Sequence, residues 1–229
     1  AMVVSKTTET EAAQMKAYTE KLPGTPGAFD LVPIPAGEFV MGSPENEEKR
    51  KKDEGPQRTV KIEPFWMSKL ETRWNEYELF MFPGLEKGTN VPSERVLGEL
   101  MINLGELPPN PSGNPYTGHE ADAVSRPTTP YVEMSFGMGK DGFPAISMTH
   151  FAAVNYCRWL TAKTGHFYRL PTEAEWEKAA RGTDRRMFPW GNEWEDAKCA
   201  NSISTKLNST APVGSYPEDK SPYGVMDMT

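Results

Sequence analysis

The sequence predicts an α+β fold in which turns and irregular backbone outweigh regular secondary structure. Its 229 residues include 21 prolines and 19 glycines, more than an ordinary helical domain contains. Residues 29–41 and 58–67 alternate apolar with small or polar side chains, as strands do. Residues 71–82, 149–165 and 172–182 instead carry apolar side chains at helical spacing. We therefore expect short strands and a minority of helices.

The chain divides into an N-terminal arm with a linker and a main domain. Residues 3–22 place apolar side chains at helical spacing, which predicts a short amphipathic helix. The stretch PGTPG at 23–27 is a linker or turn. We assign 1–27 to the arm and linker and 28–229 to the domain.

Prolines shape the predicted strands of the domain. Pro33 and Pro35 interrupt the first strand region, which favours edge strands and hairpins because proline cannot donate to a sheet ladder. A charged loop, ENEEKRKKDE at 45–54, separates this region from a second strand over 58–67.

The first helix pattern predicts one buried aromatic stripe. Within 71–82, Trp74 and Tyr77 are followed by Phe80 or Met81, so aromatic side chains recur every three to four residues. The stripe favours a core position over a cofactor site.

The second helix pattern has a start and a stop signal. Thr149 can accept a hydrogen bond as the N-cap, and Gly165 stands where a left-handed C-terminal residue belongs. We expect the inward face to contain Phe151, Val154, Cys157 or Arg158, and Leu160.

The third helix pattern begins with a capping box. Thr172 and Glu175 stand three residues apart, so each side chain can bond the other residue's amide. Trp176 and Ala179 or Ala180 are predicted to face inward, and Gly182 to close the helix.

Between the first two helix patterns lies a long proline-rich segment. It holds eight prolines between Pro83 and Pro130 and shows no period, so we interpret 83–142 as a long insertion that runs over the surface of the domain.

Charge and hydropathy argue against two classes of partner. The formal net charge is −7, and no basic patch interrupts it, so we expect no nucleic-acid partner. No apolar run approaches the roughly 20 residues of a membrane span. Residues 1–2 are typical of an expression remnant, which would hide any secretion signal.

The residues alone indicate no catalytic or cofactor-binding group. Cys157 and Cys199 form no CxxC pair, and the histidines at 119, 150 and 166 lack metal-site spacing. Nucleophile-elbow, P-loop and dinucleotide-binding motifs are absent as well.

Several segments, in order, carry a family resemblance. The chain resembles the formylglycine-generating, or sulfatase-modifying factor, family over about residues 28–82 and 143–229. Its most specific segment is RLPTEAEWEKAARG at 169–182. The matching segments are LVPIPAGEFVMGSPENE, DEGPQRTVKIEPFWMSKLETRWNEY, PAISMTHFAAVNYCRWLTAKTGHFYRLPTEAEWEKAARG, FPWGN and TAPVGSYPEDKSPYGVMDMT.

The resemblance implies a fold and an activity. The fold is a C-type-lectin-like variant with little regular secondary structure. The activity is oxidation of a sulfatase cysteine to formylglycine with molecular oxygen and a copper(I) ion held by two cysteine thiolates, soft ligands that suit this metal. In the family those cysteines lie beyond the position that matches Thr229. The resemblance thus implies that no residue of this chain is catalytic, and that a C-terminal segment packs against it.

The resemblance also implies a calcium site. Its ligands include an asparagine and the next backbone carbonyl, which match Asn201 and Ser202, and an aspartate a few residues later. The loop ISTKLNS at 203–209 holds no aspartate, a departure that weakens the calcium prediction because carboxylate charge sets calcium affinity. A second departure is Arg73, where the family usually has the threonine that caps the helix.

Three functions remain open at this point. The chain can be most of a formylglycine-generating oxidase, or a non-catalytic binding or structural module of the same fold. A relation to sulfoxide synthases of ergothioneine biosynthesis is the weakest, because no histidine motif precedes the match. A sulfatase polypeptide is the expected partner of an oxidase. A secreted or periplasmic location is expected.

Overall fold

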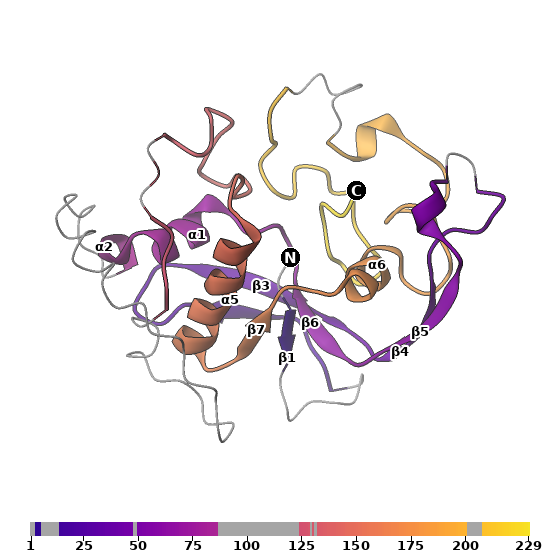
Figure 1. The fold of residues 1–229 in the computed structure, drawn as a ribbon, viewed down its shortest axis with the longest axis horizontal. Helices are drawn as coiled ribbons and strands as arrows, with labels where there is room; N and C mark the ends of the chain where they lie inside the picture. Colours follow the sequence, from indigo (N-terminus) through magenta and orange to yellow (C-terminus); the bar gives the residue numbers. More distant parts are fainter. Residues whose placement is uncertain are drawn as a thin grey trace.

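The structure, a computed structural model, describes residues 3–5, 14–47, 50–86, 124–128, 130, 132–200 and 208–229. It confirms a mixed α and β architecture with few helices and small sheets (Figure 1). The strands are β1 (Val3–Ser5), β2 (Tyr18–Lys21), β3 (Ala28–Ile34), β4 (Gly37–Met41), β5 (Arg58–Ile62), β6 (Phe65–Ser68) and β7 (Phe167–Arg169). The helices are α1 (Trp74–Met81), α2 (Pro83–Glu86), α5 (His150–Thr164) and α6 (Glu173–Arg181), with short 3₁₀ turns at Lys52–Glu54 and Asp196–Lys198.

Five strands form the central sheet, in the order β2-β3-β6-β1-β7. The neighbouring strands are antiparallel, with registers such as Val32 to Met67 and Val4 to Tyr168. Strands β4 and β5 pair separately as a hairpin, with Phe39 opposite Val60.

The two faces of the sheet belong to two different cores. Leu31 and Trp66 point to the face covered by α1 and α5. Val32 and Met67, their neighbours in sequence, point to the opposite face and pack with residues of α6 and of the C-terminal loops. In Figure 1 α1 and α5 lie on one side of the sheet, and α6 and the β4–β5 hairpin on the other.

The helix predicted over 3–22 is wrong where the structure describes it. Val3–Ser5 and Tyr18–Lys21 are strands, and β2 pairs with β3 from Tyr18–Leu31 to Lys21–Ala28. Residues 6–13 lie outside the described residues. The helical spacing of Tyr18 and Leu22 is incidental, because both side chains reach the same core from a strand and from the turn after it.

The prediction of an edge strand at Pro33 is also wrong, since β3 lies between β2 and β6. The pairing explains how proline is tolerated there. The pairing of β2 with β3 ends at Leu31 of β3. At Pro33 the side of β3 away from β6 therefore has no partner in the described sheet.

The strand predicted over 58–67 is two strands. The chain turns at Glu63–Pro64, so β5 joins the hairpin and β6 joins the central sheet. Proline at this point ends the first ladder because it has no amide hydrogen to donate.

The helix signals are largely confirmed. Trp74, Tyr77, Phe80 and Met81 are buried along α1. Thr149 caps α5, its hydroxyl accepting from Ala152 N at 3.2 Å, and Gly165 ends it with φ at 75°.

The capping box of α6 is present, and Ala179 and Ala180 are buried. Two inward assignments are wrong: Phe151 of α5 is 64% exposed and Trp176 of α6 is 42% exposed. Each lies near the start of its helix.

Part of the insertion predicted over 83–142 contacts the core. Val124 and Met134 pack against the cluster on the α1 and α5 face. Residues 87–123 lie outside the described residues. Among the described helices, none combines the length and the hydropathy that crossing a membrane requires.

Candidate functional site

A small polar pocket lies at the start of α1. Its volume is about 100 Å³. The segment from Ser68 to Arg73, which connects β6 to α1, forms one wall, and the beginning of β3, Ala28 to Asp30, forms another. Glu76 and Tyr156 complete the lining. We call this the α1 pocket.

Arg73 and Glu76 form a fixed ion pair in the α1 pocket. Arg73 Nε donates to Glu76 Oε1 at 2.8 Å, and Nη2 also bonds this carboxylate. Nη2 further donates to Ala28 O at 3.1 Å, and the backbone amide of Arg73 donates to Glu76 Oε2 at 3.0 Å. The Glu76 carboxylate thus starts the helix where the family has a threonine cap, and its hydrogen bonds raise the pKa of Arg73.

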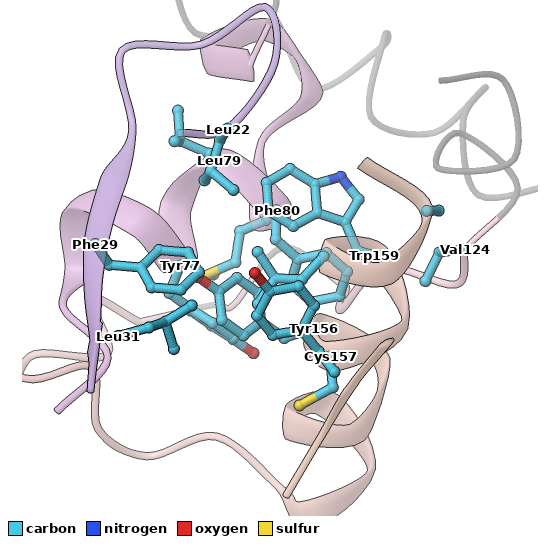
Figure 2. Close-up of a cluster of buried hydrophobic side chains, with 14 of the residues drawn as sticks. Leu22, Phe29, Leu31, Tyr77, Leu79, Phe80, Val124, Tyr156, Cys157 and Trp159 are labelled. Carbon is cyan, nitrogen blue, oxygen red and sulfur yellow. The ribbon is translucent and has the colours of Figure 1, made fainter. Parts of the chain in front are cut away.

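Tyr156 of α5 contributes to the lining of the pocket, and its hydroxyl is buried. The residue is 3% exposed, and its hydroxyl makes no hydrogen bond within the described part of the chain. Its ring lies 5.4 Å from that of Tyr77 and stacks on Trp159 at 5.8 Å, centroid to centroid (Figure 2). Burial, reinforced by the negative charge of Glu76, holds the pKa of Tyr156 well above its usual range. The hydroxyl is therefore a neutral donor.

Three carboxyl groups interact electrostatically, and one of them, Glu71, lines the α1 pocket. Burial, together with the charges of Asp227 and Asp219, raises the pKa of Glu71. Burial likewise raises the pKa of Asp219 and of Asp227. Asp227 adopts φ of 57° and accepts a hydrogen bond from Gly214 N at 2.7 Å, and Asp219 accepts one from the Thr229 hydroxyl at 2.8 Å. Burial is the main cause of all three directions, and the charge of neighbouring carboxylates adds to it for Glu71 and Asp219.

These carboxylates do not by themselves make a metal centre. Within the described residues, no group of three histidine, cysteine or acidic side chains is arranged to hold a metal ion. The predicted calcium ligands, Asn201 and Ser202, lie outside the described residues. The calcium site therefore stays a prediction.

Both cysteines of the chain are buried. Cys157 lies in α5 within the core, 2% exposed, and Cys199 is buried after the last 3₁₀ turn. Burial raises the pKa of the Cys157 thiol to about 12. A thiol of this kind supplies no thiolate at neutral pH, so Cys157 does not fit the role of a copper(I) ligand.

A histidine network was missed by the sequence prediction. His166 Nδ1 lies 2.6 Å from Glu20 Oε2, which also accepts from the Tyr168 hydroxyl at 2.6 Å. The contact between Glu20 and His166 links β2 to the turn between α5 and β7. Periodicity does not reveal this network, because it predicts a helix for the segment that contains Glu20. His150 opens α5, and His119 lies outside the described residues.

A second, wider pocket of about 530 Å³ lies between the β4–β5 hairpin and α6. Its lining mixes acidic side chains with Arg58 and Arg181. Glu177 is already bound, accepting from Gly42 N at 2.9 Å and from Arg181 at 2.6 Å. The pocket is an open, solvated surface between two elements.

The α1 pocket itself could not be found from periodicity. Its polar groups come from β3, from the β6–α1 connection and from α5, which are far apart in the sequence. The one available signal was Arg73, which departs from the family's capping residue.

Comparison with known proteins identifies the family. Residues 19–229 match the sulfatase-modifying factor enzyme 1-like domain. Formylglycine-generating enzyme of Bos taurus is 29% identical over 227 residues, which cover 86% of this chain and 54% of the relative. Hercynine oxygenase of Mycolicibacterium smegmatis is 40% identical over 89 residues, covering 37% of this chain and 19% of the relative.

The fold agrees with this match. The solved structure of PvdO from Pseudomonas aeruginosa superposes with a TM-score of 0.56 at 29% identity, covering 91% of this chain and 72% of that one. The chain spans about half the length of the bovine relative. With its mixed fold and its match over 19–229, the chain belongs to the sulfatase-modifying factor enzyme 1-like family.

Proposed function

We propose that this chain forms the larger part of a formylglycine-generating-type oxidase, which converts a cysteine of a sulfatase polypeptide to formylglycine with oxygen and copper(I). The observation that carries the proposal is the similarity to formylglycine-generating enzyme over 86% of the chain. The same fold supports different chemistries, so the activity needs its own test.

The proposal assigns the copper ligands to residues other than those of this chain. Copper(I) requires accessible thiolates, whereas Cys157 and Cys199 are buried. Cys157 is instead a core residue that packs beside Tyr156 and Leu160. The ligands would come from a C-terminal segment of the full-length protein, which also packs on this chain.

What these residues contribute is a rigid frame. The two capped helices α5 and α6 pack on opposite faces of one sheet, and the C-terminal loops hydrogen-bond to the β6–α1 connection through Met226 N and Lys69 O at 2.8 Å. In the proposed oxidase, a frame of this kind would support the segment that carries the copper ligands. We include in the proposal a calcium ion at Asn201 and Ser202, and a secreted or periplasmic location.

A non-catalytic binding or structural module of the same fold is the second candidate. The observation that favours it is that, within the described residues, no group of three histidine, cysteine or acidic side chains is arranged to hold a metal ion. The two candidates differ in a measurable activity.

The test uses the full-length protein with copper(I), oxygen and a peptide that carries a CxPxR motif. The oxidase proposal expects mass-spectrometric conversion of the peptide cysteine to formylglycine. A peptide with serine in place of cysteine is the substrate control. Cys157→Ser should retain the turnover, because the thiol has no catalytic part. Failure of the copper-loaded protein to convert the peptide would favour the binding module.

A further inference from the structure

We propose that Phe188, Trp190 and Trp194 form an aromatic platform that binds an arginine side chain of a partner polypeptide. None of these three residues lines the α1 pocket or the pocket between the β4–β5 hairpin and α6. The proposal does not depend on the oxidase activity, because it concerns binding and needs no metal.

The three rings of the aromatic platform pack together at the surface. Phe188 stacks on Trp190 with the ring centroids 5.4 Å apart, and the backbones of Phe188 and Gly191 exchange hydrogen bonds of 2.8 and 3.1 Å. Trp194 meets the other two rings at an angle, at 5.3 and 5.9 Å, and is nevertheless 47% exposed. Exposed aromatic side chains that gather in one place are typical of interaction sites.

Hydrogen bonds within the chain fix both tryptophans. Trp190 Nε1 donates to Glu193 O at 2.9 Å, and Trp194 Nε1 donates to Asp196 Oδ1 at 2.6 Å. Because both indole N–H groups are used in this way, the platform offers ring faces to a partner rather than hydrogen-bond donors. Rings that are fixed before binding lose little conformational freedom when a partner arrives.

Acidic side chains flank the most exposed ring. Glu193 and Glu195 are the sequence neighbours of Trp194, Asp196 follows them, and all three are exposed. The face of an aromatic ring carries the negative part of its quadrupole, so both the ring and the carboxylates attract a cation and repel an anion. The net charge of the whole chain, −7, favours the approach of a cationic partner as well.

The cations of this segment do not reverse that balance. Arg186 is paired with Asp184, with Nε 2.9 Å from Oδ1. The remaining cations are Arg185 and Lys198, against the three carboxylates at 193–196. The surroundings of the platform therefore stay acidic.

Lys198 gives an internal example of a cation on the platform. Its Nζ lies over the Trp190 ring, 6.0 Å from the centroid, and 2.8 Å from Glu195 Oε1. A cation held at once by a ring and by a carboxylate is the arrangement that we propose for the partner's side chain at Trp194. Guanidinium fits it better than ammonium, because its plane stacks on a ring while its N–H groups donate to a carboxylate.

The experiment titrates the full-length protein with a synthetic pentapeptide in which arginine alternates with glycine, and follows the indole N–H signals by NMR. The Trp194 signal is identified as the one that is lost in Trp194→Leu. The signals of Trp190 and Trp194 should shift with the arginine peptide, less with a lysine peptide and not with a glutamine peptide. Added salt should weaken the binding, because the charges are exposed.

Variants locate the site. Trp194→Leu keeps an apolar side chain but removes the ring, and should weaken binding of the arginine peptide by roughly fivefold, the value of one exposed cation–π contact. Trp194→Phe keeps a smaller ring and should bind with intermediate affinity. Trp176→Leu, which removes the exposed tryptophan of α6 outside the platform, is the matched control and should bind as the wild type does. Glu193→Gln removes one charge, leaves the backbone carbonyl that holds Trp190, and should also weaken binding.

The outcomes decide the proposal. Equal affinity of Trp194→Leu and Trp176→Leu for the arginine peptide would show that the Trp194 ring is not the contact, and would overturn it. Equal responses to the arginine and glutamine peptides would do the same, as would signals of Trp190 and Trp194 that do not shift. Trp194→Phe and Glu193→Gln keep the test decisive if Trp194→Leu folds poorly, since wild-type affinity in both would also overturn the proposal.

Discussion

Arg169 holds Glu175 through two parallel hydrogen bonds, from Nη1 to Oε2 at 2.7 Å and from Nη2 to Oε1 at 2.5 Å. The same carboxylate accepts from Thr172 N at 2.8 Å, so one side chain joins β7 to the first turn of α6. This fork-to-fork geometry is the strongest form of an arginine–carboxylate contact. The capping box of α6 is thereby tied to the central sheet.

Glu175→Gln should lower the free energy of unfolding by about 1–2 kcal/mol at pH 7, because it keeps the shape but loses the charge-assisted pair. Burial alone would raise the pKa of Glu175, but hydrogen bonds from Arg169 and Thr172 outweigh it and lower this pKa. The stabilisation is therefore present above about pH 4.5 and lost as the pH falls through the lowered value.

Urea unfolding between pH 7 and pH 3 checks this. The wild type should lose stability in the acid range more steeply than Glu175→Gln. Glu173→Gln, on the same helix but exposed and without an ion pair among the described residues, is the control. Equal acid slopes for wild type and Glu175→Gln would refute the proposed coupling.

Thr172→Ala should destabilise the protein by about 1 kcal/mol through the lost N-cap. The Thr172 hydroxyl accepts from Glu175 N at 3.3 Å. Thr149→Ala should cost a similar amount at α5, where Thr149 accepts from Ala152 N. Unchanged thermal stability in both variants would show that neither cap contributes.

Asp227→Asn should leave the protein at least as stable as the wild type at pH 7. Burial raises the pKa of Asp227, so its stabilising effect is present at low pH and lost as the pH rises through the raised value. Asparagine tolerates the φ of 57° and can still accept from Gly214 N. The substitution also removes one negative charge beside Glu71 and Asp219.

Denaturant midpoints at pH 4 and pH 7 give the measurement. Asp184→Asn is the opposite control, because hydrogen bonds from Arg186 lower the pKa of Asp184. The Asp184 carboxylate should therefore stabilise the folded protein at pH 7, and this stabilisation should be lost as the pH falls through the lowered pKa. A clear loss of stability in Asp227→Asn at pH 7 would mean that the charge itself is stabilising.

Cys157 should resist alkylation in the folded protein. Its thiol is buried and its pKa is raised to about 12, so thiolate is scarce at pH 8. Peptide mapping after maleimide treatment should show modification of Cys157 only in denaturant. Rapid labelling of the native protein would contradict the described core.

The sequence predicted best where local chemistry decides the structure. Thr149, Gly165, Thr172 and Glu175 act within one turn of their own backbone, and all four occupy the expected roles. Amphipathic faces were less certain at helix starts. Phe151 and Trp176 fit the apolar period, but both side chains are exposed in the structure.

The failures came from contacts between distant segments. Tyr18 and Leu22 matched a helix, but the pairing of β2 with β3 made this segment a strand, since the hydrogen bonds of a sheet outweigh a weak local preference. The α1 pocket depends on the meeting of Asp30, Arg73 and Tyr156, which no local pattern encodes.

Neighbouring side chains of a strand point into different cores, so a change in the length of a strand would alter the packing on both faces of the sheet. All four residues of β6, Phe65–Ser68, are buried, and β6 is paired on both sides. Inserting or deleting one residue would turn each side chain to the opposite face and bring Ser68 into line with an apolar core. We therefore expect insertions and deletions to be tolerated in the connections between strands and not within β6, whose residues must keep their present faces.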